Sequence, residues 1–415
     1  MNKANFSEKD YSQLKVDLKK LVDGSRIPTV STVEIDGRFK ALSLRAGNSV
    51  TGPYRALKLT PYYSSDARVT SLEKAMKMAE LYYRFDSESI EALGGSNKNQ
   101  GEYDKAKGVL EDQKGQIPNG FKMVNLDVSA VDSAELPPDG NWIEEYVKLA
   151  SAEGSNVLLM IPPGDALSAS AVLKYQLAAM SANKKLANPM YAAGYIPPMS
   201  ADECIALMDD YVSAGINTLI YDFRGRRITE GSLVHLAAIT AEGQSPVYVH
   251  GLQVSAYKMH EPFYTLYDLV MARVGVQSIS NLRRVGGGKK GAKTPMHMKL
   301  RLKCVHGYVM PSLKETYSQR RGKFSCPHCD LKEIDAAVSE NRPGKITRAT
   351  IKQNVETSCQ EFETMKVRIK ENTFKAHFEG KPGLDLLEPQ FKRLEKAISR
   401  EKERKLTKQT RLNME

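Results

Sequence analysis

The stretch "SADECIALMDDYVSAGINTLIYDF", residues 200–223, contains the pattern that decides the fold. Ser200 can cap a helix, Glu203 three residues later completes a capping box, and Gly215 ends the helix. The run 216–223 that follows is almost continuously apolar, as in a strand buried on both faces. A capped amphipathic helix followed directly by a buried strand predicts one unit of a parallel α/β fold.

The same unit recurs through the middle of the chain, at the spacing of roughly 30 residues that βαβ units have. Apolar runs predict strands at 121–128, 156–163, 189–198, 216–223, 245–252 and 274–280. Amphipathic stretches predict helices at 141–152, 166–184, 200–215, 230–242 and 262–273. The pattern favours an α/β fold of the (β/α)8 TIM-like barrel type, with a doubly wound open sheet as the alternative. No G-x-G-x-x-G follows a strand, so no dinucleotide site is expected.

The segments before and after these units have different patterns. In residues 27–60, apolar and polar residues alternate on both sides of "IDGR". This pattern predicts a hairpin that supplies the first barrel strand or plugs the barrel. A helix is expected at 69–93, followed by a polar loop, "GGSNKNQGEYDK", at 94–105. Further helices are expected at 346–372 and 388–411. The predicted organisation has four parts. Residues 1–115 form an N-terminal hairpin and helical region that contributes to the barrel, and residues 116–285 form the main barrel. Residues 286–375 form a basic loop with a zinc-binding subdomain, and residues 376–415 form a charged helix.

Composition limits the class of protein. With 415 residues, 41% of them hydrophobic, the chain can bury a sizeable core and exceeds one ordinary domain. There are 60 Lys and Arg against 49 Asp and Glu, and the net charge of +11 favours polyanionic partners. Five scattered cysteines and an N-terminus unlike a signal peptide predict a cytoplasmic protein. No apolar run approaches the roughly 20 residues of a membrane span, so no membrane role is expected.

Two pairs of soft ligands predict a metal site. Cys304 and His306 form C-x-H, and Cys326 and Cys329 form C-x-x-C about twenty residues later. Two such pairs can complete a tetrahedral Cys3His site, which predicts a structural Zn2+.

Other histidines and cysteines leave alternatives at this site. His297 and His328 are alternatives to His306 as the fourth ligand. A redox role for the C-x-x-C pair is disfavoured because no thioredoxin-like βαβ context surrounds it. Cys204 is expected in the core, and Cys359 is expected in packing or as a substitute ligand.

The segment 281–303 contains eight basic residues and no acidic one, around the glycines 286–288. The basic residues are Arg283, Arg284, Lys289, Lys290, Lys293, Lys299, Arg301 and Lys303. Cationic side chains and exposed amides suit contacts with a nucleic-acid backbone. The alternative is a basic loop without a ligand.

The order of these features resembles the tRNA-guanine transglycosylase superfamily, including its DNA-modifying branch. The resemblance rests on the (β/α) series, the basic loop, "SCPHC" at 325–329 and "IKQNVETSCQEFETMKVRIKENTF" at 351–374, and covers roughly 120–372. It implies a TIM barrel with a zinc subdomain and the exchange of a guanine in tRNA or DNA for a 7-deazaguanine base. One aspartate of that family forms a covalent intermediate, and a second acts as general acid and base.

The sequence departs from the family pattern at four places. Phe324 and Gln353 stand where the family has a cysteine and a histidine ligand, which Cys304 and His306 are placed to replace. Ser280 stands where the resemblance implies the nucleophilic aspartate, and Met160 stands at an acidic position of the base-binding turn.

Two aspartates at strand ends are the candidate catalytic residues, because barrel chemistry occurs at the carboxyl ends of the strands. Asp222 ends "LIYDF" and precedes Arg224, Arg226 and Arg227, which could keep it ionised and hold a phosphate. The alternative is an ion pair that fixes the loop. Asp127 ends "NLD", where it could instead cap the following turn.

Three further residues stand near the ends of the predicted strands. Tyr195 and Phe223 are placed to sandwich a flipped base, or to lie in the core. His250 ends "VYVH" and is either a polar contact to the base or a histidine of the barrel rim.

The leading hypothesis is a transglycosylase-like enzyme that binds tRNA or DNA and inserts a 7-deazaguanine base. A catalytically inactive paralogue, acting as a nucleic-acid-binding subunit, is the alternative, and a homo- or hetero-dimer is compatible with both. A zinc-bearing barrel enzyme acting on a small phosphorylated substrate is a third hypothesis.

Overall fold

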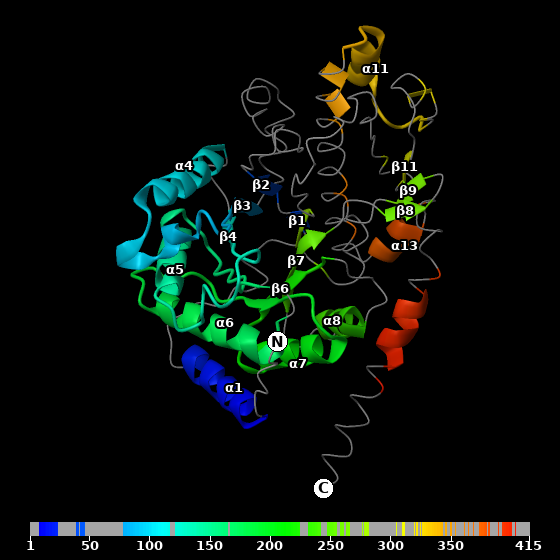
Figure 1. Cartoon of the computed structure of the whole chain (residues 1–415). Coiled ribbons are helices and arrows are strands. Elements are labelled where there is room, and N and C mark those ends of the chain that lie inside the picture. The colour runs from blue at the N-terminus through cyan, green and yellow to red at the C-terminus, as the bar shows by residue number, and fades with distance from the viewer. Residues whose placement is uncertain are drawn as a thin grey trace.

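The computed structural model of the chain describes most of residues 78–254 and shorter pieces on either side (Figure 1). Up to residue 254 the described ranges are 8–23, 39–40, 42–45, 78–116, 121–164, 167–224, 231–241 and 247–254. Beyond it they are 258–260, 263–265, 276, 278–281 and short pieces between 304 and 403, the longest being 326–342, 373–379 and 392–400.

Two parallel sheets lie at the centre of the molecule. One has the order β1-β10-β7-β6-β5 and contains β1 (Phe39–Lys40), β5 (Gly194–Ile196), β6 (Thr218–Asp222), β7 (Tyr248–Val254) and β10 (Ser278–Asn281). The other has the order β2-β3-β4 and contains β2 (Leu42–Arg45), β3 (Met78–Arg84) and β4 (Phe121–Asp127). All pairs within these two sheets are parallel. The chain is therefore a mixed α/β protein built on parallel sheets.

Isolated bridges connect strands of the two sheets. Val157 pairs in parallel with Met123 of β4 and also with Tyr191, three residues before β5 begins. At the other edge, β1 pairs with β10 and β2 pairs with β3, and only Ala41 separates β1 from β2 along the chain. Parallel contacts thus continue from one sheet to the other.

Helices occupy the outside of these strands, as crossover connections between parallel strands require. They are α4 (Gln100–Gln116), α5 (Trp142–Ala152), α6 (Ala169–Lys184), α7 (Ala201–Ser213) and α8 (Gly231–Ala241). The N-terminal helix α1 (Glu8–Asp23) packs outside α6 (Figure 1). Among the described helices, none combines the length and apolar character that a bilayer crossing requires.

The predicted capping box of α7 is confirmed. The hydroxyl of Ser200 accepts a hydrogen bond from the backbone N–H of Glu203 at 3.3 Å. The hydroxyl of Ser200 also donates to the Glu203 carboxylate at 2.7 Å. Gly215 adopts a φ of 87°, a left-handed conformation that favours glycine. Helix α7 ends at Ser213, two residues before this glycine, and β6 begins at Thr218.

Alternate residues of the strands lie in two different apolar clusters. The inner cluster contains Met123, Val157, Leu159, Ile161, Ala193, Tyr195, Ile220 and Leu252, with Tyr191 packed against it. Their sequence neighbours, such as Val124, Leu158 and Leu219, lie in the larger cluster with the helices. This period of two means that both faces of the strands are buried.

Three of the predicted elements are wrong. Residues 78–84, expected in a helix, form β3, and the expected loop at 94–105 contains the start of α4. Of the expected hairpin at 27–60, the structure describes only β1 and β2, both after the predicted turn, and they pair in parallel with β10 and β3; the segment before the turn lies outside the described residues.

The third is the helix expected at 262–273. Residues 263–265 form β9 (Phe263–Thr265), which lies in an antiparallel sheet with β8 (Lys258–His260) and β11 (Val309–Pro311). Residues 263–265, near the start of the expected helix, are therefore in a strand.

The inner face also carries buried polar side chains. Glu80, Asn125 and His250 are at most 2% exposed. Asn125 donates a hydrogen bond to the carboxylate of Glu80, and the negative charge of Glu80 also acts on His250. Burial nevertheless lowers the pKa of His250 from 6.5 to about 4.

We expect His250 to make stability depend on pH. His250 takes up a proton near pH 6.5 in the unfolded chain but only near pH 4 in the folded chain. The contribution of neutral His250 to the free energy of unfolding is therefore full above pH 6.5 and is lost as the pH falls toward 4. Between pH 7.5 and 4.5, the free energy of unfolding should fall by about 2–3 kcal/mol more in the wild type than in His250→Gln. Urea unfolding of the wild type and of His250→Gln at several pH values measures this. Parallel curves for the wild type and His250→Gln would contradict it.

Candidate strand-end site and metal centre

Asp127 is the last residue of β4, and both of its carboxylate oxygens accept hydrogen bonds. The hydroxyl of Tyr82 donates to Oδ2 at 2.6 Å. The backbone N–H and the hydroxyl of Ser129 donate to Oδ1 at 3.1 Å and 2.6 Å. The predicted capping of the following turn by Asp127 is present, and the side chain is 6% exposed. Asp127 is thus a fixed carboxylate with little access to water.

Asp222 is the last residue of β6 and is completely buried. Its Oδ2 accepts from the hydroxyl of Tyr195 and from Nε of Arg224, each at 2.9 Å. Its Oδ1 accepts from the backbone N–H of Arg224 at 2.9 Å. The ion pair with Arg224 that the sequence offered as an alternative is therefore formed.

Burial dominates the acid–base properties of this pair. Desolvation raises the pKa of Asp222 above its ordinary value, although Arg224 and the hydrogen bonds oppose that rise. Desolvation and the neighbouring Asp222 also raise the pKa of Tyr195 well above its ordinary value. Tyr195 therefore remains a neutral hydrogen-bond donor at physiological pH.

The two aspartates lie in one electrostatic environment. The charge of Asp127 acts on both Tyr195 and Arg224, the partners of Asp222. Strands β4, β5 and β6 are parallel neighbours through the bridges at Val157, so their carboxyl ends meet at one edge. The side chain of Arg224 is 33% exposed and gives this cluster its contact with solvent.

Tyr195 and Phe223, the two aromatic residues predicted either to sandwich a base or to lie in the core, are both buried but in different clusters. Tyr195 lies in the inner cluster beside Asp222, whereas Phe223 lies in the outer cluster with its ring 4.9 Å from that of Tyr221. The two rings are on opposite faces of the strands, so the predicted base sandwich between them is wrong. Met160 is also fully buried in the outer cluster, which explains an apolar residue at that position.

Several predicted site residues lie outside the described residues. They are Arg226, Arg227, Arg283, Arg284, Lys289, Lys290, Lys293 and the proposed ligand His306. The backbone of Ser280 lies in β10. Tyr82 and Ser129 were missed, because neither stands in a recognisable motif.

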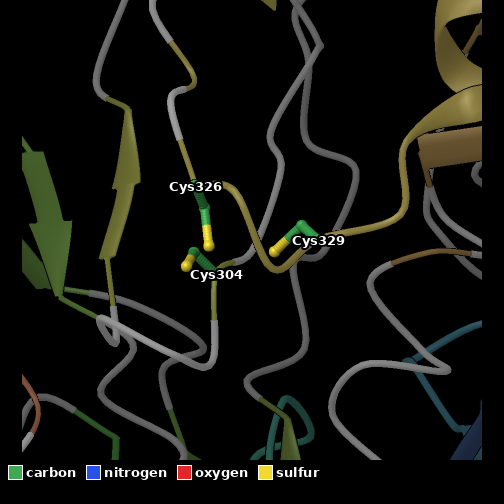
Figure 2. A group of neighbouring side chains, drawn as sticks. All are labelled: Cys304, Cys326 and Cys329. Atoms are coloured by element: carbon green, nitrogen blue, oxygen red, sulfur yellow. The ribbon is translucent and has the colours of Figure 1, made fainter.

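Three of the four predicted metal ligands lie together. The sulfur atoms of Cys304, Cys326 and Cys329 are all within 4.8 Å of one another, and Figure 2 shows the three side chains close together. Thiolates bound to one tetrahedral ion at about 2.3 Å are about 3.8 Å apart, so this arrangement fits a metal ion. No disulfide joins these described cysteines. The cluster could bind a metal.

The cysteines belong to a small core of their own. Cys304 is buried with Phe324, Leu331, Ile334, Ala337, Ile346 and Ala349. Several of these residues come from α11 (Lys332–Ser339), which directly follows the C-x-x-C turn. The hydrogen bond with the neighbouring Cys304 and burial raise the pKa of Cys329 well above its ordinary value. Cys204, in contrast, is fully buried in the main core, as predicted.

The chain matches no family model and no curated protein. Among solved structures it is similar to a predicted mandelate racemase from Rhodobacter sphaeroides, at 10% identity and a TM-score of 0.32, covering 74% of this chain and 61% of that one. It is also similar to the carboxyl transferase domain of Rhizobium etli pyruvate carboxylase, at 11% identity and a TM-score of 0.36, covering 87% of this chain and 54% of that one. The chain thus spans less than two thirds of either structure. Similarity this low assigns no activity.

Loss of one thiol should remove the metal. We expect the wild type to bind about one metal ion per chain and Cys326→Ser to bind almost none, because a tetrahedral site loses a ligand. The free energy of unfolding of Cys326→Ser should be lower than that of the wild type by several kcal/mol, since metal binding stabilises the folded state. Metal analysis and chemical denaturation measure the two effects. Cys204→Ser is the matched control, and equal metal content in both variants would contradict the assignment.

Proposed function

We propose that this chain is a base-exchange enzyme of the tRNA-guanine transglycosylase type, acting on a guanine in tRNA or DNA. The observation that supports the proposal best is the pair Asp127 and Asp222, which lie at the ends of β4 and β6 and both act electrostatically on Arg224. Base exchange through a covalent intermediate needs a nucleophilic carboxylate and a second group that holds a proton.

We further propose that the parallel strands close into an eight-stranded barrel. The strands would be residues 39–45, β3, β4, the segment around Val157, the segment from Tyr191 through β5, β6, β7 and β10. Their pairings and bridges connect each to the next, and the strand split between β1 and β2 contacts both β10 and β3. In such a barrel Asp127 and Asp222 face one opening.

Asp127 is the nucleophile in this proposal. Its carboxylate oxygen forms a bond to C1′ of the nucleotide as the bond from C1′ to N9 of guanine breaks. Asp222 transfers the proton to the leaving base, because burial raises its pKa in the direction that a proton-holding carboxyl needs. The incoming 7-deazaguanine then displaces Asp127, and its proton returns to Asp222.

The metal centre would have a structural role. We propose Zn2+ bound by Cys304, Cys326, Cys329 and His306, with no open coordination position. The zinc subdomain would hold the neighbouring basic segment near the strand ends, where Arg283, Arg284, Lys289, Lys290 and Lys293 contact phosphates. Arg224, Arg226 and Arg227 would contribute from the loop after β6.

A nucleic-acid-binding subunit without catalysis is the second candidate. It is favoured by the complete burial of Asp222, whose oxygens already accept three hydrogen bonds. It is favoured also by β10, which ends in Ser280 and Asn281 where the family resemblance implies an aspartate. This candidate predicts binding without incorporation.

Incorporation of labelled 7-deazaguanine distinguishes the two candidates. The wild type should incorporate the base into tRNA or into duplex DNA, and Asp127→Asn should lower the rate at least about a hundredfold by removing the nucleophile. Asp132→Asn, at an exposed aspartate of the same loop, should leave the rate unchanged. Binding without incorporation would reject the enzyme and support the second candidate.

The basic segment should dominate the salt dependence of binding. Replacement of Lys289 and Lys290 by Ala should weaken nucleic-acid binding and lower the salt slope by about one unit for each phosphate that is no longer neutralised. Titration by fluorescence anisotropy at several salt concentrations measures the slope. Replacement of the exposed Lys105 and Lys107 on α4 is the control. Equal slopes for the two double variants would exclude the segment from the interface.

A further inference from the structure

The carboxylate of Asp127 is restrained at both oxygens. Tyr82 holds Oδ2 through a hydrogen bond of 2.6 Å, and Ser129 holds Oδ1 through two hydrogen bonds. Rotation of the carboxylate about its terminal torsion would break bonds at both ends. This torsion is otherwise soft, because it joins an sp³ carbon to an sp² carbon. Tyr82 therefore selects one orientation of the carboxylate.

Tyr82 is itself fixed by a side chain from a helix. Its backbone N–H donates to Oε1 of Gln113 at 2.7 Å, and Nε2 of Gln113 donates back to its carbonyl at 2.9 Å. Gln113 lies on α4 and is 2% exposed. Its amide supplies the donor and acceptor that a neighbouring strand would otherwise supply. Helix α4 is thus tied to β3 at the residue whose hydroxyl reaches Asp127.

The same arrangement occurs a second time, at Asp222. The tyrosine again comes from the preceding strand of the sheet: Tyr195 of β5 donates to Asp222 of β6. The backbone N–H two residues after the aspartate again donates to its Oδ1, here from Arg224. The two sites differ in the side chain at that position, a serine after Asp127 and an arginine after Asp222. Recurrence at independent strand ends indicates a common device for orienting a strand-end carboxylate.

We propose that Tyr82 is a positioning residue for Asp127, and that Gln113 supports it through the backbone of β3. The inference rests on the proposed function, in which an oxygen of Asp127 attacks C1′. A nucleophile held in one orientation approaches the reacting carbon without first losing rotational freedom.

The experiment measures Asp127 directly and does not depend on catalysis. The full chain is labelled with aspartate carrying 13C at the side-chain carboxyl, and the Asp127 resonance is assigned by its absence in Asp127→Asn. In Tyr82→Phe this resonance should change its chemical shift and broaden, because the carboxylate loses the hydrogen bond that holds one of its oxygens in place. Tyr83→Phe is the matched control: it removes a hydroxyl from the next residue of β3, on the outer face beside Phe85.

The outcomes separate this inference from the proposed function. An Asp127 resonance that is the same in Tyr82→Phe as in Tyr83→Phe would overturn the role of Tyr82, whatever the activity. If base exchange is observed, Tyr82→Phe should lower kcat about tenfold or more with little change in KM, while Tyr83→Phe retains the wild-type rate. A changed Asp127 resonance in a chain that exchanges no base would reject the proposed function and keep the assignment of Tyr82 to Asp127.

Discussion

The ion pair between Asp222 and Arg224 is the interaction on which the strand-end cluster depends. Burial raises the pKa of Asp222, and the ionised form that remains after the proposed proton transfer is unfavourable by several kcal/mol unless a charge and hydrogen bonds compensate it. Arg224 supplies the charge and Tyr195 a further donor, both 2.9 Å from the same oxygen. Because these partners come from a neighbouring strand and from the loop after β6, the compensation joins two strand ends and orients the loop. Arg224, one third exposed, then links a buried acid to the solvent.

Burial on both faces of the strands explains why polar chemistry is confined to their ends. Apolar side chains fill the inner face at the level of Met123, Val157 and Ile220, and the helices cover the outer face. A polar group on either face must therefore find a partner inside the protein. Glu80 and Asn125 do so with each other, and the aspartates do so with tyrosines from adjacent strands. Paired polar groups inside the strands are thus a consequence of the packing.

The sequence was most informative where local pattern and tertiary packing agree. The strands β4, β6 and β7 and the helices α5 to α8 follow from apolar runs and capping residues. The strand β3 was missed because "MAELYYR" is rich in good helix formers, and its strand state comes from pairing with β2 and β4. Asp127, Asp222 and the three cysteines were found from strand ends and ligand spacing. Tyr82 was not, because its role arises only when β3 lies beside β4, a contact between residues 45 positions apart.

The cysteine cluster has a different physical basis from the strand-end site. The described part of its core consists of a few apolar side chains from the C-x-x-C turn, from α11 and from Ile346 and Ala349, a small cluster compared with the main core. Three sulfur atoms within 4.8 Å also repel one another once ionised, consistent with the raised pKa of Cys329. A bound cation reverses both effects, since it attracts the thiolates and joins positions that are more than twenty residues apart in the chain. With a metal bound, the small core and the cysteine cluster would depend on each other, whereas the strand-end aspartates rely on the main core and its internal hydrogen bonds.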